Sequence, residues 1–231
     1  MATLYGVGIG PGDPELVTLK ALRVLERVPV ICAPYTRQEG ESIAAQIAAA
    51  VLPHEAAVNK EFLTLHFPMT RDDAQLAEAW QEAAQQVAGR LAGGKDVAFV
   101  TLGDPSFYST YPYLVRAVRD LSPKVRAETI PGVTAFSACA AAGEIAVQGN
   151  ERLAVVPVTA GADLSAVMEG FDCTVFLKVG RHIGRVREAL REAGLEERAR
   201  LYERCGFAGA RQGPLEEFTS ADYLSLVVVK K

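Results

Sequence analysis

The stretch GVGIGPGDPELVTLKA, from Gly6 to Ala21, decides the expected fold at the start of the chain. It begins inside a β-rich run, Thr3 to Gly8, that leads into a glycine turn. Asp13 and Glu15 follow at a position where a helix N-terminus favours negative charge. Apolar residues then recur at helical spacing from Val17 to Val28, which predicts a helix packed against a sheet.

The same alternation of strands and helices continues to residue 101. Pro29 ends the first helix, and buried strands are predicted at residues 30–33 and 97–101, with an alternating strand at residues 62–67. They are separated by a helix through residues 43–51 and by a second helix, which starts with a capping box at Thr70 and Asp73 and stops at Gly93-Gly94. Alternation of this kind indicates parallel strands joined by crossover helices.

The second half of the chain predicts a different sheet. Candidate strands lie at residues 125–130, 153–157, 174–178, 200–204 and 224–229, and the best helix runs from Ile183 to Ala193. The last two strands are expected to pair as a hairpin, which makes this sheet mixed rather than parallel. A boundary near Leu121 to Pro123 divides the chain into domains 1–121 and 122–231. The expected fold class is α/β, with two α/β domains.

Composition narrows the class of protein. Of the 231 residues, 49% are hydrophobic and 23% are charged, which is typical of a globular chain that buries a sizeable core. The formal net charge of −4 provides no global positive field for DNA or RNA. The N-terminus lacks the pattern of a signal peptide, and the uncharged stretch from Thr129 to Gly143 is too short to span a bilayer. We expect a cytoplasmic protein with no nucleic-acid or membrane partner.

Neither the cysteines nor the histidines show the spacing of a metal site. The cysteines are widely separated and form no CxxC pair, so we interpret them as reduced thiols. They are Cys32, Cys139, Cys173 and Cys205. His54, His66 and His182 have no ligand spacing either, and the prediction is that the protein binds no metal of its own.

Three glycine-containing stretches follow predicted strands, at residues 8–14, 101–108 and 130–137. Open α/β sheets bind ligands at the carboxyl ends of their strands, so these turns are candidates for one shared site. The first lacks a dinucleotide fingerprint, because Asp13 stands where the third glycine belongs, and it lacks the Gly-Lys-Ser/Thr of a P-loop. Asp104 in the second can accept hydrogen bonds from an amine or a ribose. Purely structural turns and close helix packing remain alternatives.

Taken together, these stretches resemble the tetrapyrrole methylase family. GVGIGPGDPELVTLKA, TLGDPSFYS at 101–109 and IPGVTAFSA at 130–138 occur in the family's order and near its separations, and the resemblance covers nearly the whole chain. Within the family, LHFPMTRD at 65–72 and ERLAVVPVT at 151–159 are most similar to the precorrin-2 and cobalt-factor II C(20)-methyltransferases.

The resemblance implies a two-domain α/β homodimer that holds S-adenosylmethionine (SAM) in a cleft between its domains. The expected reaction is methylation of the C(20) meso carbon of an anionic tetrapyrrole, precorrin-2 or cobalt-factor II, in cobalamin biosynthesis. Alternatives are transfer to another ring position, to a protein side chain or to ribosomal RNA, and a SAM-sensing or nucleotide-binding module without transfer activity. The acidic charge disfavours the RNA acceptor. The sequence does not decide whether the acceptor contains cobalt.

The resemblance also assigns residues. Cofactor contacts are expected from Pro11, Gly103, Asp104, Pro105, Phe107, Tyr108, Thr134, Ala135, Lys178, Val179, Cys205 and Gly206. The family pattern often has methionine before the glycine of Leu177-Lys178-Val179-Gly180, so this chain departs from it there. Gly10 is assigned to the substrate side. Tyr108, His66 or water is expected to take the proton that leaves after methyl transfer, with no single base indispensable.

The substrate's acetate and propionate groups call for cations in the site, despite the acidic whole. The candidates are Arg37, Lys60, Arg71, Arg181, Arg185, Arg204 and Arg211. We expect two or three of these to touch substrate, because most arginines on a helix face are solvated.

Overall fold

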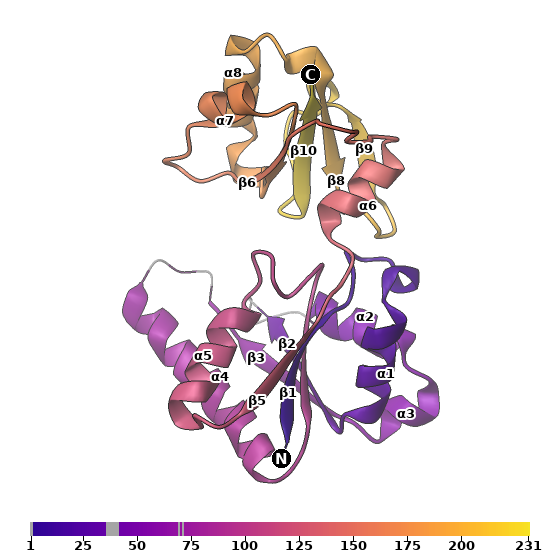
Figure 1. The fold of residues 1–231 in the computed structure, drawn as a ribbon, viewed down its shortest axis with the longest axis vertical. Coiled ribbons are helices and arrows are strands. Elements are labelled where there is room, and N and C mark those ends of the chain that lie inside the picture. Colours follow the sequence, from indigo (N-terminus) through magenta and orange to yellow (C-terminus); the bar gives the residue numbers. More distant parts are fainter. Residues whose placement is uncertain (1, 36–41, 69, 71) are drawn as a thin grey trace. The chain divides into compact units, whose positions relative to one another are not determined.

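The computed structural model describes residues 2–35, 42–68, 70 and 72–231, which divide into two compact units (Figure 1). The first unit ends at Thr134 and the second begins at Ala135. This division falls after the strand Arg126–Ile130, and not near residue 121 as the sequence suggested, because that strand pairs with the first strand of the chain. Arg37 and Arg71 lie outside the described residues.

The first unit is built on a parallel five-stranded sheet, as predicted. Its strands are β1 Thr3–Gly8, β2 Val30–Tyr35, β3 Glu61–His66, β4 Val97–Thr101 and β5 Arg126–Ile130. The order across the sheet is β3-β2-β4-β1-β5. Every residue of β1 and of β4 is buried, which explains why these strands are nearly continuous apolar runs rather than alternating ones.

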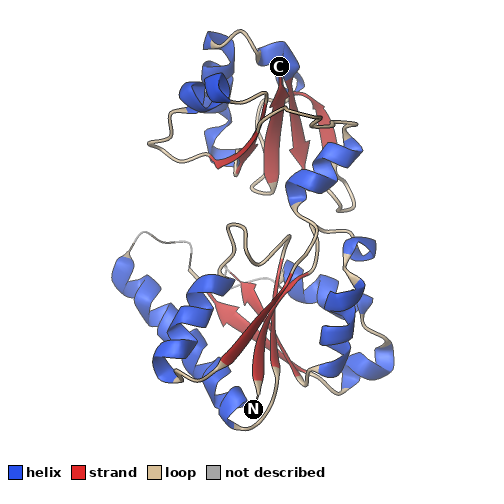
Figure 2. Ribbon diagram, viewed as in Figure 1, coloured by secondary structure: helices blue, strands red, loops and turns tan. Residues whose placement is uncertain are grey.

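Helices cover both faces of this sheet (Figures 1 and 2). One face carries α1 Leu19–Arg27, α2 Ile43–Val51 and α3 His54–Val58, and the other carries α4 Asp73–Ala92 and α5 Tyr111–Leu121. The chain steps outward from β1 to β3 and then returns to β4 and β5. Right-handed crossovers in opposite directions place their helices on opposite faces. Leu65, Phe99 and Leu114 are fully buried in the core beneath α4 and α5.

Two helix starts differ from the sequence prediction. The cap of α4 is Asp72, whose carboxylate accepts hydrogen bonds from the backbone N–H groups of Ala74 at 2.9 Å and Gln75 at 3.2 Å. The predicted capping box at Thr70 is therefore wrong: the Thr70 hydroxyl accepts from the Asp72 N–H at 3.1 Å and shapes the preceding turn. Asp13 caps the short 3-10 helix η1, Pro14–Leu16, and Thr18 caps α1.

The second unit has a mixed five-stranded sheet, also as predicted. Its strands are β6 Leu153–Pro157, β7 Cys173–Leu177, β8 Ala199–Glu203, β9 Arg211–Pro214 and β10 Ser225–Lys230, in the order β6-β7-β10-β8-β9. β6 and β7 are parallel, and the remaining pairs are antiparallel. β8 and β10 pair antiparallel, as expected, but they do not form the predicted hairpin, because β9 lies between them in sequence.

Helices cover both faces of the second sheet as well. α7 Leu164–Gly170 and α8 Ile183–Glu192 pack on one face, and α6 Ala135–Ala142 packs on the other (Figure 1). The 3-10 helices η2 Gly180–His182, η3 Glu196–Arg198 and η4 Leu215–Glu217 lie in the connections. Helices are needed on both faces of this sheet because β10 is apolar on both. Val227 and Val229 enter the core with α7 and α8, whereas Leu226 and Val228 face Cys139 of α6. In the described part of the chain, no helix is long and apolar enough for a membrane crossing.

Candidate functional site

Three glycine turns meet at the carboxyl edge of the first sheet. They follow β1, β4 and β5, which are adjacent strands. The backbone N–H of Ile9 donates to the carbonyl of Thr101 at 3.1 Å, and the N–H of Gly103 donates to the carbonyl of Gly10 at 2.7 Å. Gly10 and Gly103 form an antiparallel bridge. The predicted convergence of these turns is thus confirmed.

The close approach of the turns explains why glycine is required. A Cβ atom on Gly8 would lie 2.6 Å from the carbonyl oxygen of Gly103 and 2.7 Å from the nitrogen of Gly132. A Cβ atom on Gly132 would lie 2.2 Å from that same oxygen. Gly10 and Gly103 also have positive φ angles, of 77° and 69°. The rim of the site is therefore made largely of backbone.

Asp104 fixes the second turn against the third. Its side chain is buried, and Oδ1 accepts a hydrogen bond from the N–H of Ser106 at 2.7 Å. Oδ2 accepts from the N–H of Gly132 at 2.9 Å. Each carboxylate oxygen therefore has one backbone donor, and Asp104 holds the shape of the edge. Because a carboxylate oxygen can accept a second hydrogen bond, this role is compatible with the predicted cofactor contact.

The strand order makes this edge a topological switch point. The turn after β1 leads to α1 on one face, and the turn after the neighbouring β4 leads to α5 on the other face. In open α/β sheets, ligands bind where adjacent strands send the chain in opposite directions. The sequence could not show this, because it contains the strands but not their order.

Exposed aromatic rings flank the second turn. Phe107 and Tyr108 are 57% and 52% exposed, and Tyr108 has a φ angle of +52°. A residue other than glycine is held in that conformation only where the surroundings enforce it, and such strain concentrates at functional sites. Pro11 and Pro105 are buried beside the turns, and Thr134 ends the first unit. Most cofactor contacts expected in this unit therefore lie at one edge.

His66 lies at the same edge, paired with Tyr35. The two residues end β3 and β2 and stand directly opposite each other in the sheet register. Their ring centroids are 5.1 Å apart, with the rings tilted by 44°, and both side chains are half-buried. Sequence reasoning missed Tyr35. The signal available was its place two residues after the predicted strand 30–33, but only the register shows its partner.

Lys60 lies at the opposite, amino edge of the sheet. It precedes β3, and its ammonium donates to the carbonyls of Glu26 and Val28, both at 2.8 Å. Burial lowers the pKa of Lys60. The structure therefore does not bring Lys60 to the glycine turns, because parallel strands place a residue before β3 at the far end from one that follows β3.

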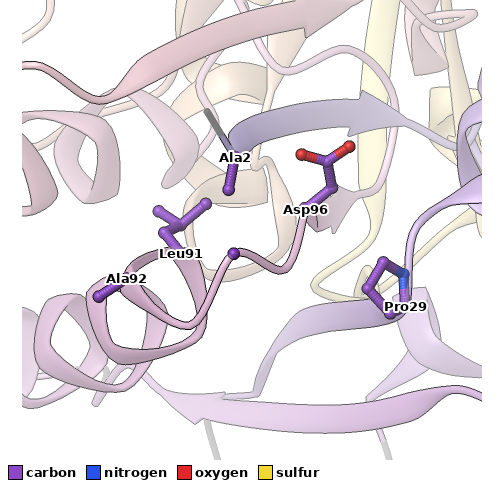
Figure 3. Close-up of a pocket in the computed structure, with 6 residues that line it drawn as sticks. Ala2, Pro29, Leu91, Ala92 and Asp96 are labelled. Atoms are coloured by element: carbon purple, nitrogen blue, oxygen red, sulfur yellow. The ribbon is translucent and has the colours of Figure 1, made fainter.

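A hollow also opens at this amino edge (Figure 3). Its volume is about 480 Å³, and it is lined by Ala2, Pro29, Leu91, Ala92, Gly94 and Asp96. Oδ1 of Asp96 accepts a hydrogen bond from the Thr3 N–H at 2.7 Å. An acidic lining residue does not suit a polyanionic ligand, so this hollow does not replace the carboxyl edge as the candidate site.

In the second unit, two predicted segments share one edge of the mixed sheet. Lys178 and Val179 follow β7, and Cys205 and Gly206 follow β8 shortly after Arg204. β7 and β8 both run antiparallel to β10 between them, so their carboxyl ends point the same way. Positive φ angles occur in both segments, at Lys178, Arg204 and Gly206.

The predicted arginines of this unit are largely engaged within it. Arg185 donates to the carbonyls of Thr159 and Ala162. The Arg204 guanidinium lies 3.9 Å from Asp222, and that of Arg211 lies 3.5 Å from the buried carboxylate of Glu203. Arg181 is exposed in η2. Three of the four therefore have local structural partners.

Cys205 forms a thiol pair with Cys139 of α6. Cys139 donates a hydrogen bond to the Cys205 sulfur, which lowers the pKa of Cys205 to about 7 and raises that of Cys139. Burial raises the pKa of Cys32 to about 12. Among the residues described here, no group of three or more His, Cys, Asp or Glu side chains is placed to hold a metal ion.

Comparison with known proteins identifies the family. The sequence profile of the Tetrapyrrole (Corrin/Porphyrin) Methylases matches residues 3–219. The chain belongs to the tetrapyrrole methylase family. Precorrin-2 C(20)-methyltransferase of Sinorhizobium sp is 37% identical, over 98% of this chain and 94% of that relative. Cobalt-precorrin-2 C(20)-methyltransferase of Salmonella typhimurium is 33% identical, over 89% of this chain and 85% of the relative.

The fold of this tetrapyrrole methylase is that of solved relatives. A crystal structure of uroporphyrin-III C-methyltransferase from Thermus thermophilus, in complex with S-adenosylhomocysteine, covers 100% of this chain. The match extends over 98% of that structure, with a TM-score of 0.67 and 22% sequence identity. At this identity the likeness is one of fold.

Proposed function

We propose that this chain transfers the methyl group of SAM to the C(20) meso carbon of precorrin-2 or of its cobalt complex, in cobalamin biosynthesis. Family membership and the two relatives named for C(20) methylation support the reaction. The observation that carries the proposal is the convergence of three glycine turns at the switch point of the first sheet.

The residues at this edge fit SAM. A Cβ atom on Gly103 would meet no atom closer than the Cα of Thr134, at 3.9 Å, so a ligand has room beside this glycine. The exposed rings of Phe107 and Tyr108 can stack on an adenine and attract a sulfonium cation. Pro11 and Pro105 stiffen the turns, and Asp104 locks the second turn to the third. We propose these residues, with Gly103 and Thr134, as the cofactor contacts of the first unit.

Alignment is what the chain contributes to the reaction. SAM carries its methyl group on a sulfonium, so the leaving group needs no further activation by the protein. Rigid turns that hold the donor in line with the acceptor carbon can supply roughly 7–11 kcal/mol of the barrier. Turns that are joined by backbone hydrogen bonds and by the Asp104 carboxylate suit this task, because they do not have to be ordered when the ligand binds.

The proton that leaves the methylated carbon needs an acceptor. His66 ends β3, separated from β4 by β2, and is thus about 10 Å along the edge from the second turn at the usual strand spacing. A macrocycle is broad enough to cover that distance. We propose His66 as an acceptor, with Tyr108 or water as the other candidates.

The remaining assignments are proposals, and all but Gly10 and Lys60 concern the second unit. Lys178, Val179, Cys205 and Gly206 stay predicted cofactor contacts, Ala135 begins α6, and Gly10 stays a predicted substrate contact. Arg181, Arg185, Arg204 and Arg211 stay candidates for the substrate carboxylates. Arg181 is the favoured one, because the other three are held by carbonyls or carboxylates of their own unit. Lys60 does not belong to the proposed site.

We also propose that the chain acts as a cytoplasmic homodimer that binds neither nucleic acid nor membranes. The family resemblance supports the dimer, and the acidic net charge supports the absence of nucleic acid. Light scattering at micromolar concentration should give twice the mass of one chain. A monomeric mass at concentrations that support full activity would contradict the dimer.

The deciding experiment is a methyl-transfer assay in the absence of oxygen, which protects the reduced tetrapyrrole. Incubation with ¹³C-methyl SAM and precorrin-2, or its cobalt complex, should add one methyl to the tetrapyrrole and release one S-adenosylhomocysteine. Carbon NMR should place the label at C(20). Label at another carbon would contradict the ring position, and SAM binding without transfer to either acceptor would favour a SAM-sensing module. The faster acceptor identifies the metal state of the substrate.

A further inference from the structure

Buried neighbours anchor the end of β3 that carries His66. Leu65 and Phe67, the neighbours of His66, point into the opposite core and are 0% and 5% exposed. The Phe67 ring packs 4.3 Å from the Trp80 ring. Because side chains alternate along a strand, burying both neighbours forces the imidazole of His66 to the other face.

Hydrogen bonds to the backbone also anchor the end of β2 that carries Tyr35. The N–H of Phe67 donates to the carbonyl of Tyr35 at 2.9 Å, which extends the β2–β3 ladder by one bond. The hydroxyl of Ser42, a buried residue, donates to the carbonyl of Pro34 at 2.7 Å and also caps α2. The backbone at Pro34 and Tyr35 is thus held in place independently of any ligand, and the Tyr35 ring itself lies against the His66 ring.

These contacts leave the imidazole confined but reachable. His66 is half-buried, and the Tyr35 ring lies against it at 5.1 Å between centroids. A ring on one side and buried neighbours along the strand limit the rotamers that His66 can adopt. A neutral imidazole carries a free nitrogen lone pair for a proton, whereas a phenol already carries its own proton.

We infer that Tyr35 is a positioning residue, whose ring orients the His66 imidazole to accept the proton from the methylated meso carbon. The inference rests on the proposed function. In the first step, the electron pair of the meso carbon forms the bond to the methyl group while the sulfur–methyl bond breaks and its pair stays on sulfur. In the second, the carbon–hydrogen proton moves to the imidazole nitrogen, and its electron pair restores the ring conjugation. Water then takes the proton from the imidazolium.

The test separates methyl transfer from proton loss in single turnovers. Quenched samples report S-adenosylhomocysteine, and the absorbance of the conjugated macrocycle reports proton loss. Wild-type protein should give one rate for both signals. In His66→Ala, proton loss should lag by about 100-fold while methyl transfer keeps its rate, a size typical of general-base catalysis. In Tyr35→Ala, proton loss should lag about tenfold behind methyl transfer. Tyr35→Phe keeps the ring and should show the wild-type rate of proton loss.

The double variant decides whether Tyr35 acts through His66. Adding Tyr35→Ala to His66→Ala should slow proton loss no further. Added imidazole should restore proton loss in the His66→Ala single variant and in the double variant. Tyr113→Ala is the matched control, because it removes a tyrosine ring whose centroid lies 5.4 Å from that of Trp80, on the opposite side of the sheet from His66. His66→Gln replaces His66→Ala if the alanine variant does not fold, as judged by thermal melting.

The outcomes separate this inference from the proposed function. Tyr35→Ala with wild-type proton loss, or a double variant slower than His66→Ala, would overturn the positioning role. Equal slowing of both signals in Tyr35→Ala would do the same, because it would show general damage to the site. If wild-type protein releases no S-adenosylhomocysteine with either tetrapyrrole, the proposed function fails first, and this inference with it.

Discussion

The two edges of the first sheet differ in the chemical groups that form them. At the carboxyl edge, backbone groups of the first and second glycine turns bond to each other, and the Asp104 carboxylate bonds to the backbone of the third turn. The rings of Phe107 and Tyr108 are exposed there. At the amino edge, charged side chains bond to their own surroundings. Glu61 pairs with Arg90 at 2.7 Å and with Lys95 at 3.4 Å, and Lys60 binds two carbonyls.

This difference teaches that charge alone is a poor guide to the substrate side of this molecule. Lys60 was a reasonable candidate for a carboxylate contact by composition, yet strand direction places it at the wrong end. In the described part of the carboxyl edge, the glycine turns present open backbone and aromatic surface where a ligand can be aligned. The account therefore predicts large functional effects at one edge and small, structural effects at the other.

The largest effect is expected for Gly132→Ala. Its Cβ would lie 2.2 Å from the carbonyl oxygen of Gly103, so the third turn must move away from the second. We expect a loss of about 1–3 kcal/mol in the free energy of unfolding, as for other overpacked sites, and at least tenfold weaker SAM binding. Denaturant unfolding and calorimetric titration measure the two quantities.

Gly89→Ala is the matched control for that change. Gly89 lies inside α4, and a Cβ there meets nothing within 4 Å. Alanine should raise the free energy of unfolding by about 0.5–1 kcal/mol and leave SAM binding unchanged. Equal behaviour of the two variants would contradict the close packing of the turns.

A similar loss of stability, with a smaller loss of SAM affinity, is expected for Asp104→Asn. An amide has one acceptor oxygen, so the N–H of either Ser106 or Gly132 loses its partner and faces an NH₂ group. The free energy of unfolding should fall by about 1–3 kcal/mol, and the affinity for SAM should drop roughly tenfold. A variant that keeps full stability would contradict the structural role of these two hydrogen bonds.

Lys60→Met tests the amino edge. Methionine keeps the apolar length of the chain but removes the donor to the carbonyls of Glu26 and Val28. Stability should fall by about 1 kcal/mol, the size of a typical hydrogen bond. The KM for the tetrapyrrole should stay unchanged. A several-fold rise in that KM at unchanged stability would return Lys60 to the substrate site.

The smallest effect is expected for Glu61→Gln, and it depends on pH. The hydrogen bond from Arg90 holds the pKa of Glu61 below its ordinary value of 4.5. The folded state therefore gains stability from Glu61 above that value and loses it as the pH falls through the lowered pKa. Because the side chain is 35% exposed, the difference at pH 7 should stay below about 1 kcal/mol and vanish in acid. A difference that grows in acid would have the wrong sign.

Local sequence patterns predicted most elements of the fold. β1 and β6 have the predicted limits, and the glycine turns follow strands as expected. α5 was not predicted, although Tyr111, Leu114, Val115 and Val118 recur at helical spacing. The cap of α4 was misplaced because Thr70 and Asp72 are both good capping residues, and local pattern alone does not choose between them.

Features that depend on pairing could not be read from the sequence. The boundary between the two units lies after Thr134 rather than near residue 121, because β5 pairs with β1 in the first sheet. Strand order is a property of the whole unit. The Tyr35–His66 pair depends on the register between β2 and β3. The role of Asp104 in joining the second turn to the third depends on its hydrogen bond from Gly132, which is distant in sequence. Each of these is a long-range contact, so a local pattern carries no signal of it.

The most direct test of the central claim is amide hydrogen exchange with and without S-adenosylhomocysteine. The account predicts slower exchange, on ligand binding, in peptides covering residues 8–13 and 101–108. Peptides covering residues 60–61 and 90–96 at the amino edge should be unaffected. Bound ligand with protection at the amino edge, and none at the glycine turns, would contradict the account.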